Sequence, residues 1–118
     1  MEEVLKKIIN LDKIKGAWWW DNKKLKEVSN IPLDINTTNQ LKKIFLMLFN
    51  LFEEKNLKKE IGCAFEYDFL LFKRVNKNWI VIWAKKDIPL ALLRMETEVI
   101  LSGVASQKSK NFKKLKFW

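Results

Sequence analysis

The sequence predicts an α/β domain: a five-stranded antiparallel sheet with helices on both faces, in the order α-β-β-α-β-β-β-α. Two observations predict this fold. Apolar residues recur with helical spacing in three segments, and five short segments bounded by turn residues carry strand patterns. A chain of 118 residues is long enough for one such domain and too short for two. We assign residues 1–105 to this domain and residues 106–118 to a basic, aromatic tail.

A helix and a hairpin open the chain. Apolar residues at positions 4, 5, 8 and 9 recur with the spacing of an amphipathic helix, which we expect to end near Asp12. Residues 15–20 and 24–29 have strand character, and the turn between them falls at residues 21–23. Thr37 and Gln40 then form a capping box, which predicts the start of a second helix.

The second helix, residues 41–54, has more apolar surface than contact with one sheet requires. At 100° per residue, its apolar side chains cover about half of the helix circumference. Around the helix they follow the order Met47, Ile44, Leu48, Leu41, Phe52 and Phe49, and Leu46 lies outside this arc. A helix on one sheet needs an apolar stripe of roughly 100°. We therefore expect another polypeptide to cover the surplus.

This surplus divides the second helix into two predicted groups. For Ile44, Phe45, Leu48 and Phe52 we favour a place in the core of the domain itself, and contact with a partner is the alternative. The group expected at an interface with a partner, at the flanks of the arc or beyond it, is Leu46, Met47, Phe49 and Leu51. Methionine and phenylalanine both suit a surface that contacts another protein.

Three strands and a last helix complete the domain. Residues 61–66, 69–75 and 79–85 are the strands, with tight turns at residues 67–68 and 76–78. Pro89 suits the first turn of the last helix, and Gly103 marks its predicted end. The inner face of this helix is expected to hold Leu90, Leu93, Thr97, Ile100 and Val104.

Two of the five strands differ from the others in being apolar on both faces. These are the segments of residues 17–20 and 79–83. Strands of this kind are covered on both sides of the sheet, so we expect these two to be central and adjacent. The first and last helices then share one face of the sheet, and the second helix covers the other.

The net charge of +9 is concentrated at the C-terminal end. Residues 106–118 hold five lysines and no acidic residue, and subtracting these five charges leaves +4 for the rest of the chain. An anionic partner of this tail is expected to meet Lys110, Lys113, Lys114, Lys116 and Trp118. Two alternative interpretations of the same residues are a disordered, solubilising end and a last helix that runs on and packs Phe117 and Trp118 against the body of the domain.

The sequence contains few residues or motifs that indicate catalysis. It has no histidine, no glycine-rich phosphate loop and no cluster of metal-ligating residues, so we expect no enzyme, no cofactor and no metal. The single cysteine, Cys63, is expected to be a small strand hydrophobe. The chain carries neither a secretory signal nor an apolar run long enough to span a membrane, and we expect a cytoplasmic protein.

The order of elements over residues 1 to about 105 resembles the roadblock (dynein light-chain) family, and more closely its prokaryotic MglB-like branch, within the profilin-like group of α/β folds. Three features carry the resemblance. Gly16-Ala17 opens the first strand, Asp21 stands at its turn, and the strand of residues 78–83 leads through Asp87 into a helix with a leucine-arginine start, residues 90–94. The chain departs from the family where a glycine usually follows the aspartate, and here Asn22 must take its conformation.

This resemblance implies a homodimer. In roadblock proteins the middle helices pack antiparallel and the third strands pair edge to edge, which assigns those roles to residues 41–54 and 61–66, with Cys63 and Phe65 contributed by the strand segment. In the prokaryotic branch the helix face of the dimer, or the surface beside it, receives a small Ras-like GTPase. The resemblance therefore implies a non-enzymatic adaptor or regulator of such a GTPase, with no small-molecule substrate.

Two other functions stay open on the sequence. One is a module that binds nucleic acid or a membrane surface through the basic tail, with the fold serving only to dimerise. The other is a ligand-sensing domain of the profilin or PAS-like plan, which a pocket of small-molecule size between helix and sheet would favour.

Overall fold

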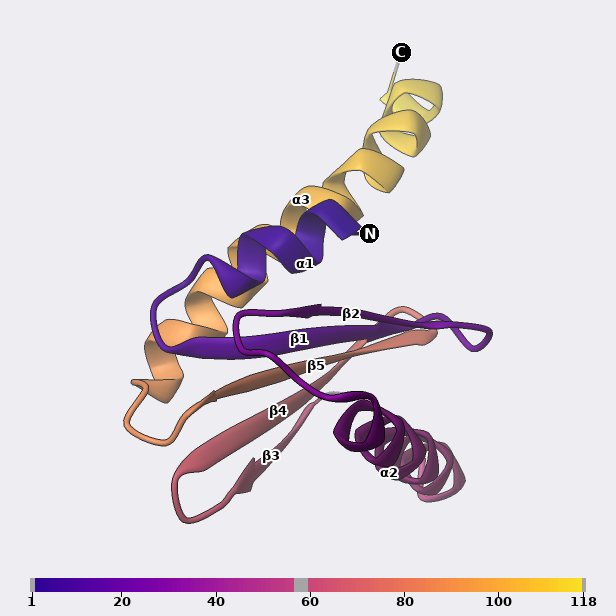
Figure 1. Ribbon diagram of the computed structural model, residues 1–118. Coiled ribbons are helices and arrows are strands. Elements are labelled where there is room, and N and C mark those ends of the chain that lie inside the picture. Colours follow the sequence, from indigo (N-terminus) through magenta and orange to yellow (C-terminus); the bar gives the residue numbers. More distant parts are fainter. Residues whose placement is uncertain (1, 57–59, 118) are drawn as a thin grey trace.

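The chain forms three helices and five strands in the order that the sequence predicts (Figure 1). The computed structural model describes residues 2–56 and 60–117, and the side chains of residues 2–56 and 60–103. The elements are α1 (Glu2–Ile9), β1 (Ile14–Trp20), β2 (Leu25–Ser29), α2 (Ile35–Glu54), β3 (Glu60–Ala64), β4 (Asp68–Val75), β5 (Asn78–Lys85) and α3 (Leu90–Phe117). The predicted fold class is confirmed.

The five strands form one antiparallel sheet in the order β2-β1-β5-β4-β3. The two strands that are apolar on both faces, β1 and β5, are adjacent and lie at or next to the centre, as predicted. Trp18 lies opposite Val81 and Trp20 opposite Trp79 in their pairing. The edge strands are β2 and β3.

Each face of the sheet has its own core. On one face α1 and α3 pack over a cluster that includes Leu5, Ile80 and Leu93. On the other face α2 covers an aromatic cluster that includes Trp18 and Phe72. Figure 1 shows this layering, with α2 alone below the sheet. Because successive strand residues point to opposite faces, a strand covered on both sides must be apolar throughout, which explains the sequences of β1 and β5.

The start of α2 differs from the prediction. The helix begins at Ile35, and Asp34 is its N-cap: the Asp34 carboxylate accepts a hydrogen bond of 2.6 Å from the backbone N–H of Thr37. This hydrogen bond lowers the pKa of Asp34. The predicted capping box at Thr37 and Gln40 is therefore wrong. The helix begins about one turn before the predicted cap, and the Asp34 carboxylate satisfies a free backbone N–H of its first turn.

The turn between β3 and β4 lies one or two residues earlier than predicted. β3 ends at Ala64, so Phe65 lies just beyond the strand, and Asp68 opens β4 instead of closing the turn. Asn22 has a φ of 73°, so it takes the left-handed conformation expected where the family has a glycine. The Asp21 carboxylate accepts hydrogen bonds from the backbone N–H groups of the two lysines that follow Asn22, which lowers the pKa of Asp21.

The last helix does not end at Gly103. α3 runs from Leu90 to Phe117, and a Cβ at Gly103 would meet no atom within 4 Å. The glycine therefore lies inside the helix and does not cap it. The predicted tail residues, Lys110, Lys113, Lys114, Lys116 and Trp118, lie outside the residues whose side chains are described. The domain boundary at residue 105 stays a prediction.

Thr97 offers a test of the packing between α3 and the sheet. Its side chain is fully buried, and within the described part of the chain its hydroxyl has no hydrogen-bond partner. We expect Thr97→Val to raise the free energy of unfolding by about 1 kcal/mol in urea denaturation, because valine removes a buried polar group that lacks a partner. Thr38→Val, at a half-buried position of α2, is the control. A loss of stability in Thr97→Val alone would contradict this prediction.

Candidate protein-binding surface

One side of α2 carries large apolar side chains that the domain leaves uncovered. Met47 is 72% exposed and Ile44 is 49% exposed, Leu51 is also exposed, and Leu48 is half-buried. These four residues follow the i, i+3, i+4, i+7 spacing of one helix face. We call them the α2 stripe: Ile44, Met47, Leu48 and Leu51. Met47, Leu48 and Leu51 also line a shallow depression on the helix surface.

The opposite side of α2 is aromatic and buried. Phe45, Phe49 and Phe52 point onto the sheet, where their rings contact those of Phe72 and Trp79. Phe49 is only 2% exposed. Its expected place at an interface is therefore wrong. The inner face of the helix is centred on these three phenylalanines, and Phe49 lies next to that centre and not at a flank.

The remaining residues of the helix show how the apolar arc is divided. Ile44, expected in the core, is about half exposed and belongs to the uncovered side. Leu46, expected at the interface, is half-buried and packs against the aromatic cluster beneath α2. Phe45 and Phe52 are buried in the core, which agrees with the favoured interpretation and contradicts their alternative place at a partner interface, and Met47 and Leu51 are exposed. That the exposed residues contact a partner stays a prediction.

The strand β3 forms one edge of the sheet. Among the described residues, β3 pairs only with β4. Ile61 and Cys63 are half-buried and pack against the cluster beneath α2, while Phe65, just past the strand, is exposed. Phe65 N–H donates to the carbonyl of Asp68 at 2.8 Å. Along an antiparallel strand, the backbone N–H and C=O groups of successive residues point alternately toward a neighbouring strand and away from it. Since the N–H of Phe65 points toward β4, the N–H and C=O groups of Ala64 point away from β4, to the free edge.

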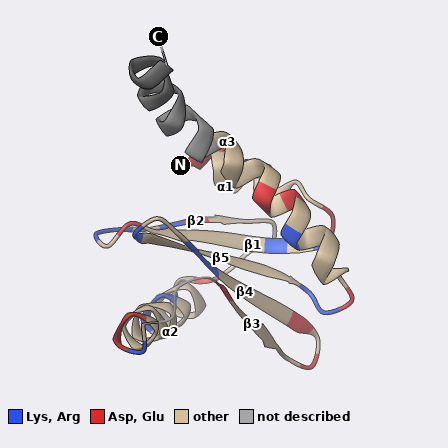
Figure 2. Cartoon of the chain, turned by 180° about the vertical axis from the view of Figure 1, so that it is seen from behind, with Lys and Arg blue, Asp and Glu red and all other residues tan. Residues whose placement is uncertain are grey.

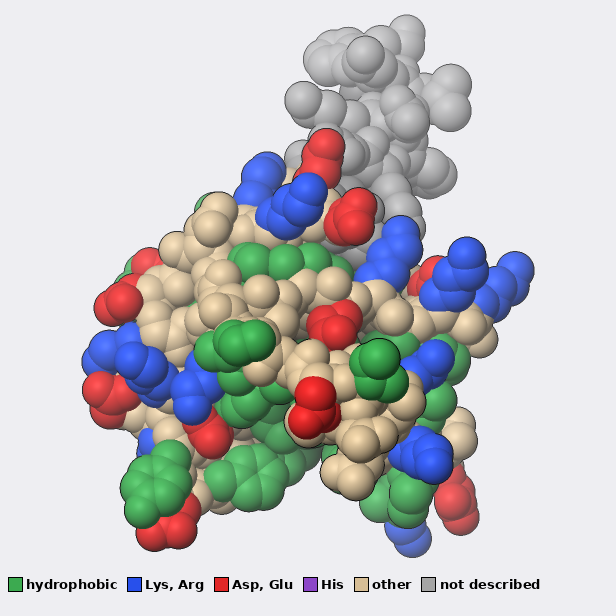
Figure 3. Space-filling model, viewed as in Figure 1, with side chains coloured by type: hydrophobic (Ala, Val, Ile, Leu, Met, Phe, Trp, Pro, Cys, Tyr) green, Lys and Arg blue, Asp and Glu red, His purple; other side chains and the backbone are tan. Residues whose placement is uncertain are grey.

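Apolar side chains gather between the β3–β4 hairpin and α2, in the lower part of Figure 3. A cavity of about 180 Å³ opens there, lined by Trp18, Leu41, Phe45, Phe65, Asp68, Leu70 and Trp83. Asp68 forms an ion pair with Lys15 at its rim. The volume is below the range of roughly 300–1,000 Å³ that is usual for small-molecule sites. This cavity therefore gives the ligand-sensing interpretation little support, and its apolar lining suits a side chain of another protein.

Both arginines are held by carboxylates on the body of the domain. Arg74 pairs with Glu53 at 3.2 Å and its guanidinium lies 5.8 Å from the centre of the Trp79 ring, while Arg94 pairs with Glu60 at 2.5 Å. Lys73 joins the second pair through Glu60 and Glu98, and its partial burial lowers its pKa. These pairs connect α2 to β4 and α3 to the edge strand β3. Figure 2 shows that the central strands β1 and β5 carry few charged residues.

A second uncovered apolar row, which was not predicted, lies on α3. Leu92, Met95 and Val99 are exposed and lie at i, i+3, i+7 on the solvent side of the helix. The signal was present, since the sequence has apolar residues on both sides of this helix, but only the inner face was assigned.

Two kinds of feature are absent from the part of the chain that the structure describes. No helix among these residues is long and apolar enough to cross a membrane. No group of three or more histidine, cysteine, aspartate or glutamate side chains among the same described residues is placed to hold a metal ion.

The fold is that of the roadblock class of α/β domains, and three solved structures show the similarity. A roadblock/LC7 domain from Streptomyces avermitilis has a TM-score of 0.71 and 10% sequence identity, over 92% of this chain and 98% of that chain. MglC from Myxococcus xanthus has a TM-score of 0.62 and 14% identity, over 90% and 97%. The gliding protein MglB from Thermus thermophilus has a TM-score of 0.67 and 16% identity, over 89% and 85%. No family model and no curated protein sequence matches the chain. The expected structural relationship is confirmed at the level of the fold.

Proposed function

We propose that this chain is a homodimeric, non-enzymatic regulator of the roadblock type that binds a small Ras-like GTPase. The observation that carries the proposal is the α2 stripe, an exposed apolar helix face on the same side of the sheet as the half-buried residues of the open strand β3. Exposed apolar faces of this kind mark contact sites for other proteins.

A second copy of the chain fits this surface. Two β3 strands can pair antiparallel about a two-fold axis, which would join the two sheets into one and remove a free edge. The same axis would bring the α2 helix of the second copy beside the first. An interface between identical surfaces needs no second complementary patch, so one broad apolar helix serves both copies.

The GTPase partner rests on the resemblance to MglB-like proteins, in which the helix face of the dimer, or the surface beside it, receives a Ras-like GTPase. Apolar surface beyond the α2 stripe supports such a partner. Phe65 and Tyr67 are exposed at the hairpin next to β3, and Ile35 is exposed at the start of α2. A homodimer that buries the stripe would leave residues at the ends of the seam for another protein.

The GTPase proposal is tested by direct binding. The full-length chain is immobilised, and a Ras-like GTPase from the same organism is passed over it, loaded with GDP or with a non-hydrolysable GTP analogue. We expect saturable binding that differs between the two nucleotide states, because the surface loops of these GTPases change with the nucleotide. An absence of binding in both states, with the chain folded and dimeric, would refute the GTPase partner and leave the dimer standing.

The pairing of β3 strands is tested by Ala64→Pro. Proline removes an N–H that points to the free edge, so we expect the β3–β4 ladder and the thermal stability of the domain to be retained. The dissociation constant of the dimer is expected to rise roughly tenfold or more, because each copy loses an intermolecular donor. Analytical ultracentrifugation measures it. Cys63→Pro is the contrasting variant, since it removes a donor to β4 and is expected to destabilise the fold itself. An unchanged dimer in Ala64→Pro would rule out this pairing.

A further inference from the structure

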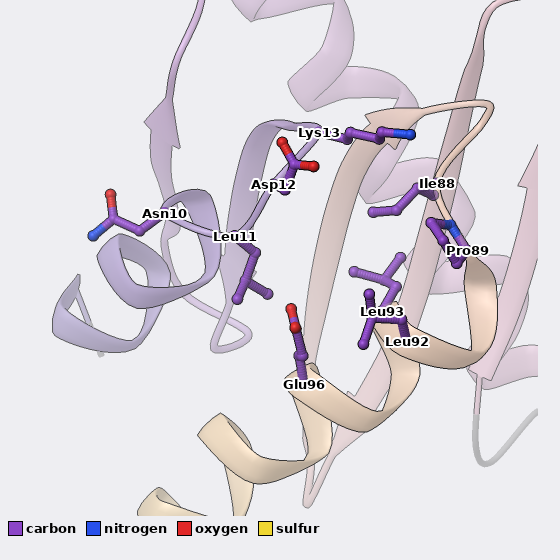
Figure 4. Close-up of a pocket in the computed structure, with 9 residues that line it drawn as sticks. All are labelled: Asn10, Leu11, Asp12, Lys13, Ile88, Pro89, Leu92, Leu93 and Glu96. Carbon is purple, nitrogen blue, oxygen red and sulfur yellow. The ribbon is translucent and has the colours of Figure 1, made fainter.

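A groove lies on the face of the sheet opposite α2, between the α1–β1 connection and the beginning of α3. It has a volume of about 290 Å³ and is shown in Figure 4. The residues that line it are Asn10, Leu11, Asp12, Lys13, Ile88, Pro89, Leu92, Leu93 and Glu96. No part of the proposed dimer seam contributes to it.

The walls of the groove are apolar. In Figure 4, Leu11 comes from one side, and Ile88 and Leu93 come from the other. Leu92 belongs both to this wall and to the exposed row on α3, in which Met95 is 59% and Val99 is 68% exposed. The groove and this row therefore form one continuous apolar surface on α3.

The charges at the groove are acidic. Figure 4 shows the Glu96 carboxylate pointing toward Leu11, with Asp12 at the far end. Neither carboxylate forms an ion pair with any cation among the described residues. The one cation of the lining, Lys13, extends toward the Ile88 side of the groove and is paired with Asp87 at 2.9 Å, and this hydrogen bond lowers the pKa of Asp87. The groove thus has two negative charges beside apolar walls and no free positive charge from its own lining.

The chemistry that fits such a groove is a lysine-rich segment with apolar side chains. Lysine stems pack on apolar walls while their ammonium groups reach carboxylates. Residues 106–118 have this composition: five lysines, no acidic residue, and the apolar side chains of Phe112, Leu115, Phe117 and Trp118. The rest of the chain carries +4 and repels a basic segment at long range, so a locally acidic, apolar groove is the complementary place.

The segment and the groove must belong to different copies. α3 is one helix from Leu90 to Phe117, and Phe112 stands sixteen residues after Glu96, or about 24 Å farther along the axis at 1.5 Å per residue. A continuous helix cannot bring this part back to its own first turns. We propose that the groove between α1 and α3 binds the basic, aromatic segment of residues 106–118 of a second copy of the chain. This contact is independent of the α2 stripe.

The test uses a fluorescently labelled synthetic peptide of residues 106–118 and the full-length chain, with binding measured by fluorescence anisotropy. We expect saturable binding that weakens with added salt. Glu96→Lys is expected to weaken it at least tenfold, and Leu92→Lys, at the exposed edge of the groove, is a second variant. Glu66→Lys is the matched control, because it makes the same charge change at an exposed position of the β3–β4 turn and should leave the affinity unchanged.

Two additional controls separate the possible outcomes. A peptide with serine in place of its four large apolar residues should bind at least tenfold more weakly, and Met47→Glu, on the α2 stripe, should bind the native peptide as the wild type does. The proposal is overturned by an absence of binding, by equal weakening in Glu96→Lys and Glu66→Lys, or by full affinity of the serine peptide. Peptide binding in the groove does not depend on the α2 stripe. It should therefore still be observed if the dimer proposed to form through that stripe does not exist.

Discussion

Phe49→Ala is expected to lower the free energy of unfolding by about 3–5 kcal/mol, the usual cost of removing a buried phenylalanine ring. Phe49 is almost fully buried, and its ring lies about 6 Å, centre to centre, from the rings of Trp20, Phe72 and Trp79. A cavity at this point removes contacts to β1, β4 and β5 at once. Urea denaturation followed by tryptophan fluorescence measures the loss.

Phe65→Ala is the control for this prediction. Phe65 is the same residue type but is exposed, so its truncation should change the free energy of unfolding by less than about 1 kcal/mol. Equal effects of the two substitutions would contradict the burial of Phe49 and would restore it to the predicted interface.

Met47→Glu is expected to turn the dimer into a monomer at micromolar concentration without destabilising the fold. Met47 is 72% exposed in the single chain, so a glutamate there meets water in the monomer. In a two-fold seam the two glutamates would be desolvated close to each other, and the dissociation constant should rise about a hundredfold or more. Sedimentation velocity over a range of concentrations measures the change.

Lys42→Glu is the matched control on the same helix. Lys42 is exposed and lies on the side of α2 away from the stripe, so a glutamate there should leave the dimer intact. A wild-type chain that sediments as a monomer at micromolar concentration would refute the dimer directly, and dissociation by both variants would show a general charge effect.

Much of the fold could be predicted because its signals are local. Helical spacing and strand patterns gave the order of all eight elements. The apolar character of β1 and β5 on both faces placed them side by side and distributed the helices over both faces. The errors fell at element ends. Asp34 took the cap that Thr37 was expected to form, and Gly103 did not stop α3, because neighbouring residues compete for such roles at small cost.

The candidate surface was predicted only in part. The sequence identified α2 and its excess of apolar surface, and it named Met47 and Leu51, which are exposed. It assigned Phe49 and Ile44 to the wrong sides of the helix, and it did not detect the exposed row on α3. The pattern of a helix gives the angle between its side chains but not the direction of the sheet beneath it, so flank residues cannot be sorted without the packing.

By itself, the sequence determined that this chain has an α/β fold whose middle helix is apolar over about half of its circumference, since periodicity fixes the width of an apolar arc. Only the tertiary structure decided where that arc is divided. The aromatic side chains of β1, β4 and β5 receive Phe45, Phe49 and Phe52, which turns Ile44 and Met47 to the outside. Burial depends on the surface that each side chain meets, and that surface is built from strands that are distant along the chain.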